Sequence, residues 1–288
     1  MSARPTVIIG HDLPPDMAEA IREMGVEIER NDNRKPRTAG KVIVVVSPKG
    51  GSGKTAIASN LSVALSQRHP GEVVAVDLDV QFGDLGTALA LQPERTIAQL
   101  ARTDEINATT AKLFLTPYDG LFVLAGADTP AEADAVTTAH ISTVLPLLAQ
   151  EFAYVVVDTP AGLDERTLSA LECATDLLVV SSLDVNSIRS LRKAIDALDR
   201  IGITAARTFV LNRADAKVGL DVADAEEAVG MKADVQVPSS REIPMAMNIG
   251  TPVVKSVPRA QVSKRIQQLA QRFAPLSDDD KPKRGWLR

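Results

Sequence analysis

The chain has 288 residues, of which 45% are hydrophobic, 24% are charged and only 3% are aromatic. A chain of this length can bury roughly three quarters of its unfolded surface, so a large α/β domain with a small appendage needs no disulfide or structural metal. One cysteine excludes an internal disulfide framework, and the three histidines form no short-spaced zinc motif. The net charge of −5 argues against a bulk polyanion binder, although the segment after Pro258 is basic.

The N-terminus has no signal-peptide pattern, and the apolar runs are far shorter than a membrane span. We therefore expect a cytoplasmic protein. The first 38 residues predict a short β-α-β unit, with strands at Thr6–Ile9 and Val26–Ile28 and a helical segment at residues 14–24. The polar stretch from 31 to 40 is typical of a linker.

Residues 39–275 alternate apolar runs with amphipathic patterns, which predicts a mostly parallel twisted sheet flanked by helices. The runs are continuous and β-branched, as is typical of strands buried on both faces. The predicted strands are Val42–Val46, Val73–Val76, Leu121–Leu124, Tyr154–Val157, Leu177–Val180 and Thr208–Leu211. Apolar residues at a spacing of about 3.6 predict helices near residues 57–65, 188–198 and 262–273. Residues 276–288 are polar, and we expect a basic flexible tail there.

The strongest motif is Lys49-Gly50-Gly51-Ser52-Gly53-Lys54-Thr55, which lies between a predicted strand and a predicted helix. A phosphate-binding loop requires this strand–loop–helix context. Glycines let backbone N–H groups approach an anion, and the helix N-terminus adds its positive dipole. The Lys54 ammonium can reach the β- and γ-phosphates of a nucleotide, and the Thr55 hydroxyl can bind Mg²⁺. The sequence therefore predicts a site for a nucleoside triphosphate and Mg²⁺.

Carboxylates follow two other predicted strands: Asp77 and Asp79 after the second strand, and Asp158 after the fourth. The carboxyl ends of parallel strands meet at the crevice where α/β sheets bind ligands. We expect Asp158 to be the Walker B residue, which holds Mg²⁺ through water, and Asp77 to be a second carboxylate near that ion. Alternatively, Asp77 and Asp79 are solvated groups that cap local N–H groups. Asp84 is expected to cap the helix that follows it.

In order and spacing, these motifs resemble the deviant Walker A ATPases of the ParA/MinD family, whose loop reads K-G-G-x-G-K-[ST]. The family does not need a glycine where Pro48 stands, and many members have a second threonine where Ala56 stands. The resemblance covers residues 40–273 and implies an ATPase that forms a homodimer when it binds ATP and Mg²⁺. It also implies that Lys49 reaches the phosphates of the partner's nucleotide, and that Asp79 orients the attacking water. The catalytic residues are then Lys49, Lys54 and Asp79, and the magnesium residues are Thr55, Asp77 and Asp158.

The adenine pocket is implied by the same resemblance. Asn212 resembles the family's adenine-contacting residue, and its amide offers both a donor and an acceptor to a base edge. The alternative is that Asn212 is a turn residue. Ser240 stands where members often have an acidic residue. The predicted nucleotide-binding residues are Lys49, Gly50, Gly51, Ser52, Gly53, Lys54, Thr55, Ala56, Asn212, Arg213, Pro238 and Ser239.

Within this family, the stretch Asp77–Leu89 most resembles the pilus-assembly members called CpaE or TadZ. That resemblance implies a switch that positions the Flp/Tad pilus machinery, with a pilus-assembly or polar-localisation protein as partner. Those members carry an N-terminal receiver-like domain, of which residues 1–38 are a truncated form. Asp12 lacks the partners of a phosphoacceptor site, so phosphorylation is not expected. A scaffold that binds nucleotide with little turnover is the alternative.

Three other functions compete with this one. A chromosome or plasmid partitioning ATPase would bind DNA through surface cations. The candidate cations, which also fit an ordinary solvated face, are Arg189, Arg192, Lys193, Arg200 and Arg207. A septum-site-determining ATPase would end in an amphipathic membrane helix at the inner face of the membrane or a cell pole. The apolar stripe available for it, which equally fits a helix packed on the sheet, is Val262, Ile266, Leu269 and Phe273. An iron–sulfur reductase needs two cysteines per subunit, and only Cys173 is present.

Overall fold

The computed structural model describes residues 6–9, 27–30, 39–81 and 83–275, which fall into two units, Met1–Thr38 and Ala39–Arg288. In the first unit, β1 (Thr6–Ile9) and β2 (Glu27–Arg30) form a parallel pair. The first strand is as predicted, and the second begins one residue later than predicted. The helix expected at residues 14–24, the linker and the tail at 276–288 lie outside the described residues.

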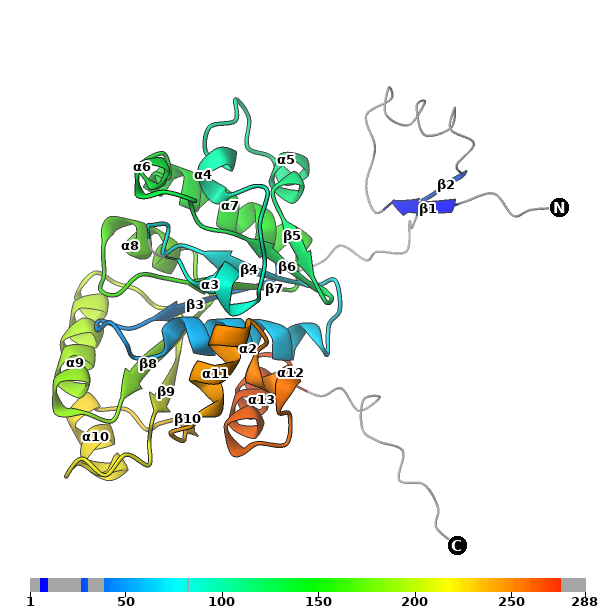
Figure 1. The fold of residues 1–288 in the computed structure, drawn as a ribbon. Coiled ribbons are helices and arrows are strands. Elements are labelled where there is room, and N and C mark those ends of the chain that lie inside the picture. The colour runs from blue at the N-terminus through cyan, green and yellow to red at the C-terminus, as the bar shows by residue number, and fades with distance from the viewer. Residues whose placement is uncertain (1–5, 10–26, 31–38, 82, 276–288) are drawn as a thin grey trace, which may run out of the picture. The chain divides into compact units, whose positions relative to one another are not determined.

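The second unit is built on an eight-stranded sheet with the strand order β10-β9-β8-β3-β7-β4-β6-β5 (Figure 1). All neighbouring strands are parallel except β5 and β6. The strands are β3 (Lys41–Val46), β4 (Val73–Asp77), β5 (Thr116–Tyr118), β6 (Leu121–Leu124), β7 (Tyr154–Asp158), β8 (Asp176–Ser182), β9 (Ala206–Asn212) and β10 (Val235–Val237). The six predicted strands are the six central ones, which confirms the mostly parallel sheet.

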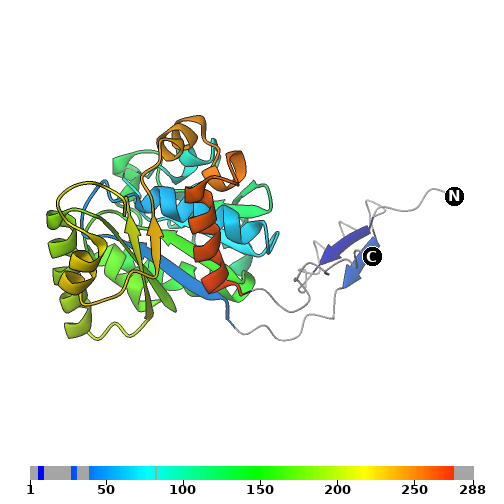
Figure 2. The same ribbon diagram turned by 90° about the horizontal axis from the view of Figure 1, so that it is seen from below.

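Helices cover both faces of this sheet (Figures 1 and 2). One face packs against α2 (Lys54–Ser66), α3 (Leu85–Ala88), α11 (Glu242–Ile249), α12 (Val253–Ser256) and α13 (Gln261–Phe273). The other face packs against α4 (Ile97–Leu100), α5 (Ala108–Leu113), α6 (Pro130–Ala133), α7 (Thr138–Glu151), α8 (Glu165–Glu172), α9 (Val185–Arg200) and α10 (Val222–Val229).

Strand β3 shows why the central strands are apolar on both sides. Val42, Val44 and Val46 belong to one core cluster, whereas Ile43 and Val45 belong to the other, because successive side chains of a strand point to opposite faces. All five are buried. A strand between two helical layers therefore has no polar face, and this produces the continuous apolar runs.

The amphipathic stripe of α13 is buried against the sheet. Val262, Ile266, Leu269 and Phe273 are at most 3% exposed, and α13 lies beside α2 in both ribbon views. This confirms the packed-helix interpretation, and the lipid-facing alternative is wrong for these four residues. Among the residues that the structure describes, no helix combines the length and apolar composition that a membrane span requires.

Candidate active site

The predicted phosphate loop connects β3 to α2 at the carboxyl edge of the sheet. Gly51 and Gly53 have φ angles of +74° and +94°, which side chains rarely tolerate. Left-handed residues of this kind turn successive N–H groups toward one point, which favours an anion. Lys54 begins α2 and is buried. The loop is also joined to the segment after β7, because the Gly162 N–H donates to the Ser47 carbonyl oxygen at 3.1 Å.

Two predicted magnesium carboxylates lie side by side beneath this loop. Neighbouring strands β4 and β7 place Asp77 opposite Asp158 in register, and both are at most 2% exposed. Burial raises the pKa of Asp158 to about 7, while the Thr55 hydroxyl and the Lys54 ammonium oppose the rise. Burial, and then the charge of Asp158, raise the pKa of Asp77 well above its usual value. Two buried carboxylates in contact cannot both ionise without a neutralising cation.

The hydrogen bonds of the two carboxylates differ. Asp77 accepts from the N–H groups of Asp79 and Leu85, at 3.1 and 3.2 Å, and so holds both ends of the loop between them. Neither carboxylate oxygen of Asp158 makes a hydrogen bond within the described part of the chain. The oxygens of Asp158 are thus available to a ligand, whereas those of Asp77 hold the loop between Asp79 and Leu85. Asp84 is the N-cap residue of α3, as predicted, but its side chain bonds to no N–H of that helix, and the Leu85 N–H donates to Asp77 instead.

Asp79 lines an open cleft of about 350 Å³ between the loop after β4 and the segment before α8. The other residues that line it are Leu78, Val80, Gln81, Pro160, Asp164, Glu165 and Arg166. Burial lowers the pKa of Lys54, and the charges of Asp158 and Asp79 oppose that shift. The structure therefore brings Lys54 close enough to Asp79 and Asp158 for both carboxylate charges to act on its ammonium group.

Lys49, the second lysine of the loop, pairs with a different carboxylate. Its Nζ atom lies 3.1 Å from Oδ1 of Asp184, and both side chains are about 40% exposed. Asp184 also caps α9 by accepting from the N–H and hydroxyl of Ser187. Burial alone would raise the pKa of Asp184, but the hydrogen bonds from Ser187 and Lys49 keep it below its usual value. The sequence analysis missed Asp184, although it too follows a predicted strand.

The predicted base-side residues line one small cavity of about 140 Å³ beside the loop. Those predicted from the sequence are Gly53, Ala56, Asn212, Arg213, Pro238 and Ser239, and Ser240, Ile243 and Pro244 complete the wall. Asn212 is the buried last residue of β9, so the turn-residue alternative is wrong. The Ser240 hydroxyl, on the wall of this cavity, donates to the Glu242 carboxylate.

A family model described as an AAA domain matches residues 40–209, which is more than half of the chain. The chain belongs to this family and is a ParA/MinD-type ATPase. The septum site-determining protein MinD of Thermotoga maritima is 27% identical over 251 residues, which cover 83% of this chain and 92% of that protein. The cell division ATPase MinD of Pyrococcus furiosus has a similar structure, with 29% identity and a TM-score of 0.73 over 83% of this chain and 100% of that one. The MinD of Pyrococcus horikoshii complexed with Mg-ADP has 24% identity and a TM-score of 0.73, over 84% and 98% of the two chains.

The residues of this ParA/MinD-type ATPase fit ATP and Mg²⁺. A buried carboxylate with two unpartnered oxygens, close to a hydroxyl and an ammonium, is an oxygen donor set that a magnesium ion satisfies. A bound Mg²⁺ neutralises charge on phosphate oxygens. The buried Lys54 supplies a fixed positive charge on the same side, so the site can hold a triphosphate chain that water would otherwise solvate.

The raised pKa of Asp158 predicts an unusual pH dependence for the nucleotide-free ATPase. Its pKa of about 7 in the folded state lies above the ordinary 3.8, so the folded protein holds a proton that the unfolded chain releases. This contribution stabilises the fold as the pH falls from 7 toward 4 and is lost as the pH rises through 7. Asp158→Asn should therefore raise the free energy of unfolding at pH 8, with a gain that shrinks at pH 5.

Denaturant unfolding at both pH values, without nucleotide, measures this difference. Asp104→Asn is the matched control, because Asp104 is an exposed carboxylate outside the site. A gain from Asp158→Asn that is equal at pH 5 and pH 8 would show that Asp158 is ionised at both and that burial does not raise its pKa.

Proposed function

We propose that the protein is a dimerisation switch that binds Mg-ATP, hydrolyses it to ADP and phosphate, and thereby positions other cellular machinery. Two features together carry this proposal: Asp158 is buried and its oxygens accept no hydrogen bond within the described residues, and the second loop lysine, Lys49, is partly exposed in its pair with Asp184. The Asp158 carboxylate fits the metal end of a nucleotide. The Lys49 side chain can give up its pair with Asp184 and reach a second subunit, because an exposed ion pair contributes only about 0–1 kcal/mol.

In this proposal, the phosphate chain lies on the N–H groups of the loop from Gly50 to Thr55. Thr55 and Asp158 hold Mg²⁺, with Asp77 near it as a structural carboxylate. The base occupies the cavity beside Gly53, where Asn212 and Arg213 face Pro238 and Ser239. That cavity adjoins the loop, which supports a ligand with a base at one end and phosphates at the other.

Hydrolysis requires a positioned water and positive charge on the leaving phosphates. In this proposal, Asp79, which lines the open cleft and interacts electrostatically with Lys54, accepts a hydrogen bond from the attacking water. Lys54 neutralises charge within its own subunit. Lys49 exchanges Asp184 for the phosphates of the second subunit, so turnover requires the dimer.

For the cellular role, we propose localisation of the Flp/Tad pilus machinery, supported by the CpaE/TadZ-like stretch Asp77–Leu89. Placement of a cell division site is the second candidate, because several similar proteins are named septum site-determining MinD. A membrane contact by this chain cannot use the stripe of α13, which is buried. The basic tail predicted at residues 276–288 lies outside the described residues.

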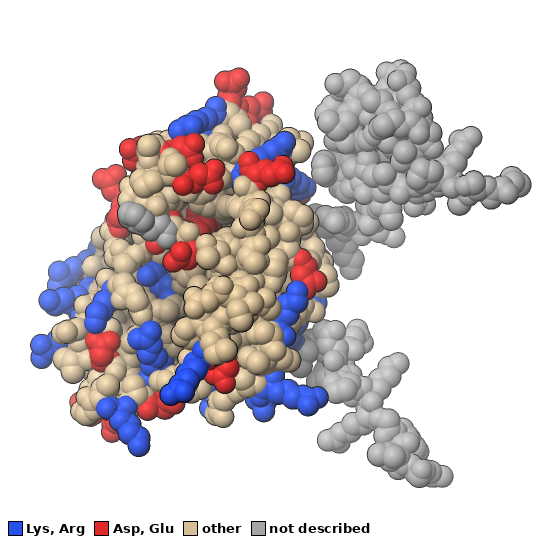
Figure 3. All heavy atoms as spheres, viewed as in Figure 1, with Lys and Arg blue, Asp and Glu red and all other residues tan. Residues whose placement is uncertain are grey.

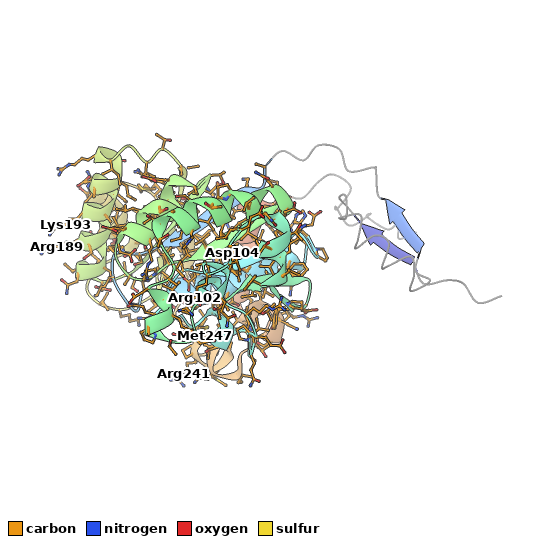
Figure 4. The ribbon with its side chains drawn as sticks, turned by 90° about the horizontal axis from the view of Figure 1, so that it is seen from above. Arg102, Asp104, Arg189, Lys193, Arg241 and Met247 are labelled. Carbon is orange, nitrogen blue, oxygen red and sulfur yellow. The ribbon has the colours of Figure 1, made fainter. Side chains whose placement is uncertain are left out.

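Two of the five candidate cations of the DNA-binding alternative form surface ion pairs in this structure. Arg192 and Arg207 pair with Asp196 and Asp199, at 3.0 and 2.6 Å. Arg189, Lys193 and Arg200 are exposed, and Arg189 and Lys193 lie together on the outer side of α9 (Figure 4). On the face drawn in Figure 3, acidic side chains gather over the half with α4 to α6, and basic ones over the half with α9 to α13. A partner that uses the basic half must therefore avoid the acidic half.

Asp79→Ala tests the switch. The variant should bind Mg-ATP and dimerise but not hydrolyse, because the water loses its carboxylate, so the dimer should persist for hours rather than decay. Light scattering after mixing with Mg-ATP measures this, with Asp104→Ala as the exposed-carboxylate control. A variant that stays monomeric, or that turns over normally, would contradict the proposal. Sedimenting the trapped dimer with DNA and with anionic vesicles then distinguishes the alternative surfaces.

A further inference from the structure

Asn212 is held rigidly between two strands at the edge of the base cavity. It ends β9, where it is in register with Ser182 of β8 and Val237 of β10. Its carbonyl oxygen accepts from the Leu183 N–H at 3.2 Å, immediately before Asp184. The sheet therefore holds the backbone of Asn212 in place, and a group that bonds to its side chain is held in place as well.

The side-chain amide of Asn212 has both of its ends engaged. Its Oδ1 atom accepts from the Arg213 N–H at 3.0 Å, and its Nδ2 atom donates to the Ser52 carbonyl oxygen at 2.8 Å. Turning the amide over would place oxygen against oxygen and nitrogen against N–H, so this orientation alone satisfies both partners. The residue that donates this N–H, Arg213, lies in the left-handed region with a φ of +54°. The amide therefore joins β9 directly to the phosphate loop.

The shape of the loop is matched to this amide. Gly53 has a φ of +94°, and a Cβ atom there would collide with Nδ2 of Asn212. The amide thus occupies the space that the missing side chain leaves, and it bonds to the residue just before the glycine. Asn212 is 6% exposed, so water cannot readily replace it as the donor to Ser52.

We propose that Asn212 is a positioning residue for the phosphate loop: its amide holds the turn at Ser52 and Gly53 in the form that binds the phosphate chain. This proposal rests on the proposed function, and it adds to any contact between Asn212 and the base. Because one amide serves the loop and the base cavity, the two halves of the site form one hydrogen-bonded unit. A ligand that has phosphates but no base should therefore still depend on Asn212.

Magnesium tripolyphosphate is such a ligand, and its affinity tests the proposal directly. Asn212→Ala removes the donor, and Asn212→Asp keeps the acceptor for Arg213 but sets an oxygen against the Ser52 carbonyl. Both should weaken tripolyphosphate binding, by about 5- to 30-fold for the loss of one buried hydrogen bond. Asn248→Ala is the matched control, because Asn248 is exposed on α11 away from the cavity. Titration calorimetry of each variant with tripolyphosphate and with ATP gives both affinities.

Hydrogen exchange of the nucleotide-free protein supplies a second readout. In the Asn212 variants, the amide of Ile57, which donates to the Gly53 carbonyl oxygen at 2.9 Å, should exchange faster while β8 and β10 stay protected, which a general loss of stability would not produce. If tripolyphosphate affinity and Ile57 exchange are unchanged while ATP affinity falls, Asn212 acts through the base alone and the proposal is overturned. If the unmodified protein binds neither ligand, the proposed function fails instead, and Ile57 exchange still tests the positioning role.

Discussion

Lys54→Ala is expected to abolish measurable ATP binding. The Lys54 ammonium is the cation that is buried next to the loop, and burial already lowers its pKa because few groups offset its charge in the absence of phosphate. Loss of two hydrogen bonds between this ammonium and phosphate oxygens would weaken binding by at least about a hundredfold. Titration calorimetry with Mg-ATP measures the loss.

The fold should survive this substitution. Removing Lys54 also removes a charge that holds down the pKa of Asp158, so that carboxyl should stay protonated at neutral pH and need no partner. An unfolding midpoint close to that of the unmodified protein, with no binding, is the expected pair of results. An unchanged ATP affinity would refute the assignment of this loop to phosphates.

Lys49→Ala should separate binding from turnover. Lys49 pairs with Asp184 at the start of α9 rather than with Asp77 or Asp158, so its removal leaves the metal end of the site intact. ATP affinity of the monomer should change little, because an exposed pair contributes weakly. Hydrolysis and ATP-dependent dimerisation should be lost, and a cation supplied in trans to developing phosphate charge can contribute about 10³-fold or more in rate.

Two measurements decide this case. A phosphate-release assay gives the turnover rate, and light scattering gives the mass in the presence of Mg-ATP. Arg189→Ala is a suitable control, because it removes an exposed cation from the neighbouring helix without touching the loop. A Lys49→Ala protein that hydrolyses ATP normally would show that Lys49 does not act on the partner's nucleotide.

Sequence reasoning missed the two edge strands for a physical reason. β5 and β10 have three residues each, too few to show a pattern, and β5 contains Pro117, which lowers its strand propensity. One signal was available: Asp119 and Gly120, with φ values of +45° and +79°, form the two-residue turn between β5 and β6. Edge strands are held by one neighbour only, so their sequences are less constrained than those of the centre.

The amino-acid sequence alone determined the parallel core and the phosphate loop, because both depend on local properties. Continuous apolar, β-branched runs favour strands that are buried between two helical layers, and glycines beside lysines favour a loop whose backbone an anion can approach closely. Only the tertiary structure decided which carboxylate is left unpartnered, which acid holds Lys49, and that Asn212 bonds to Ser52. Lys49 and Asp184 are 135 positions apart and Asn212 and Ser52 are 160 apart, so strand order rather than spacing brings these residues together.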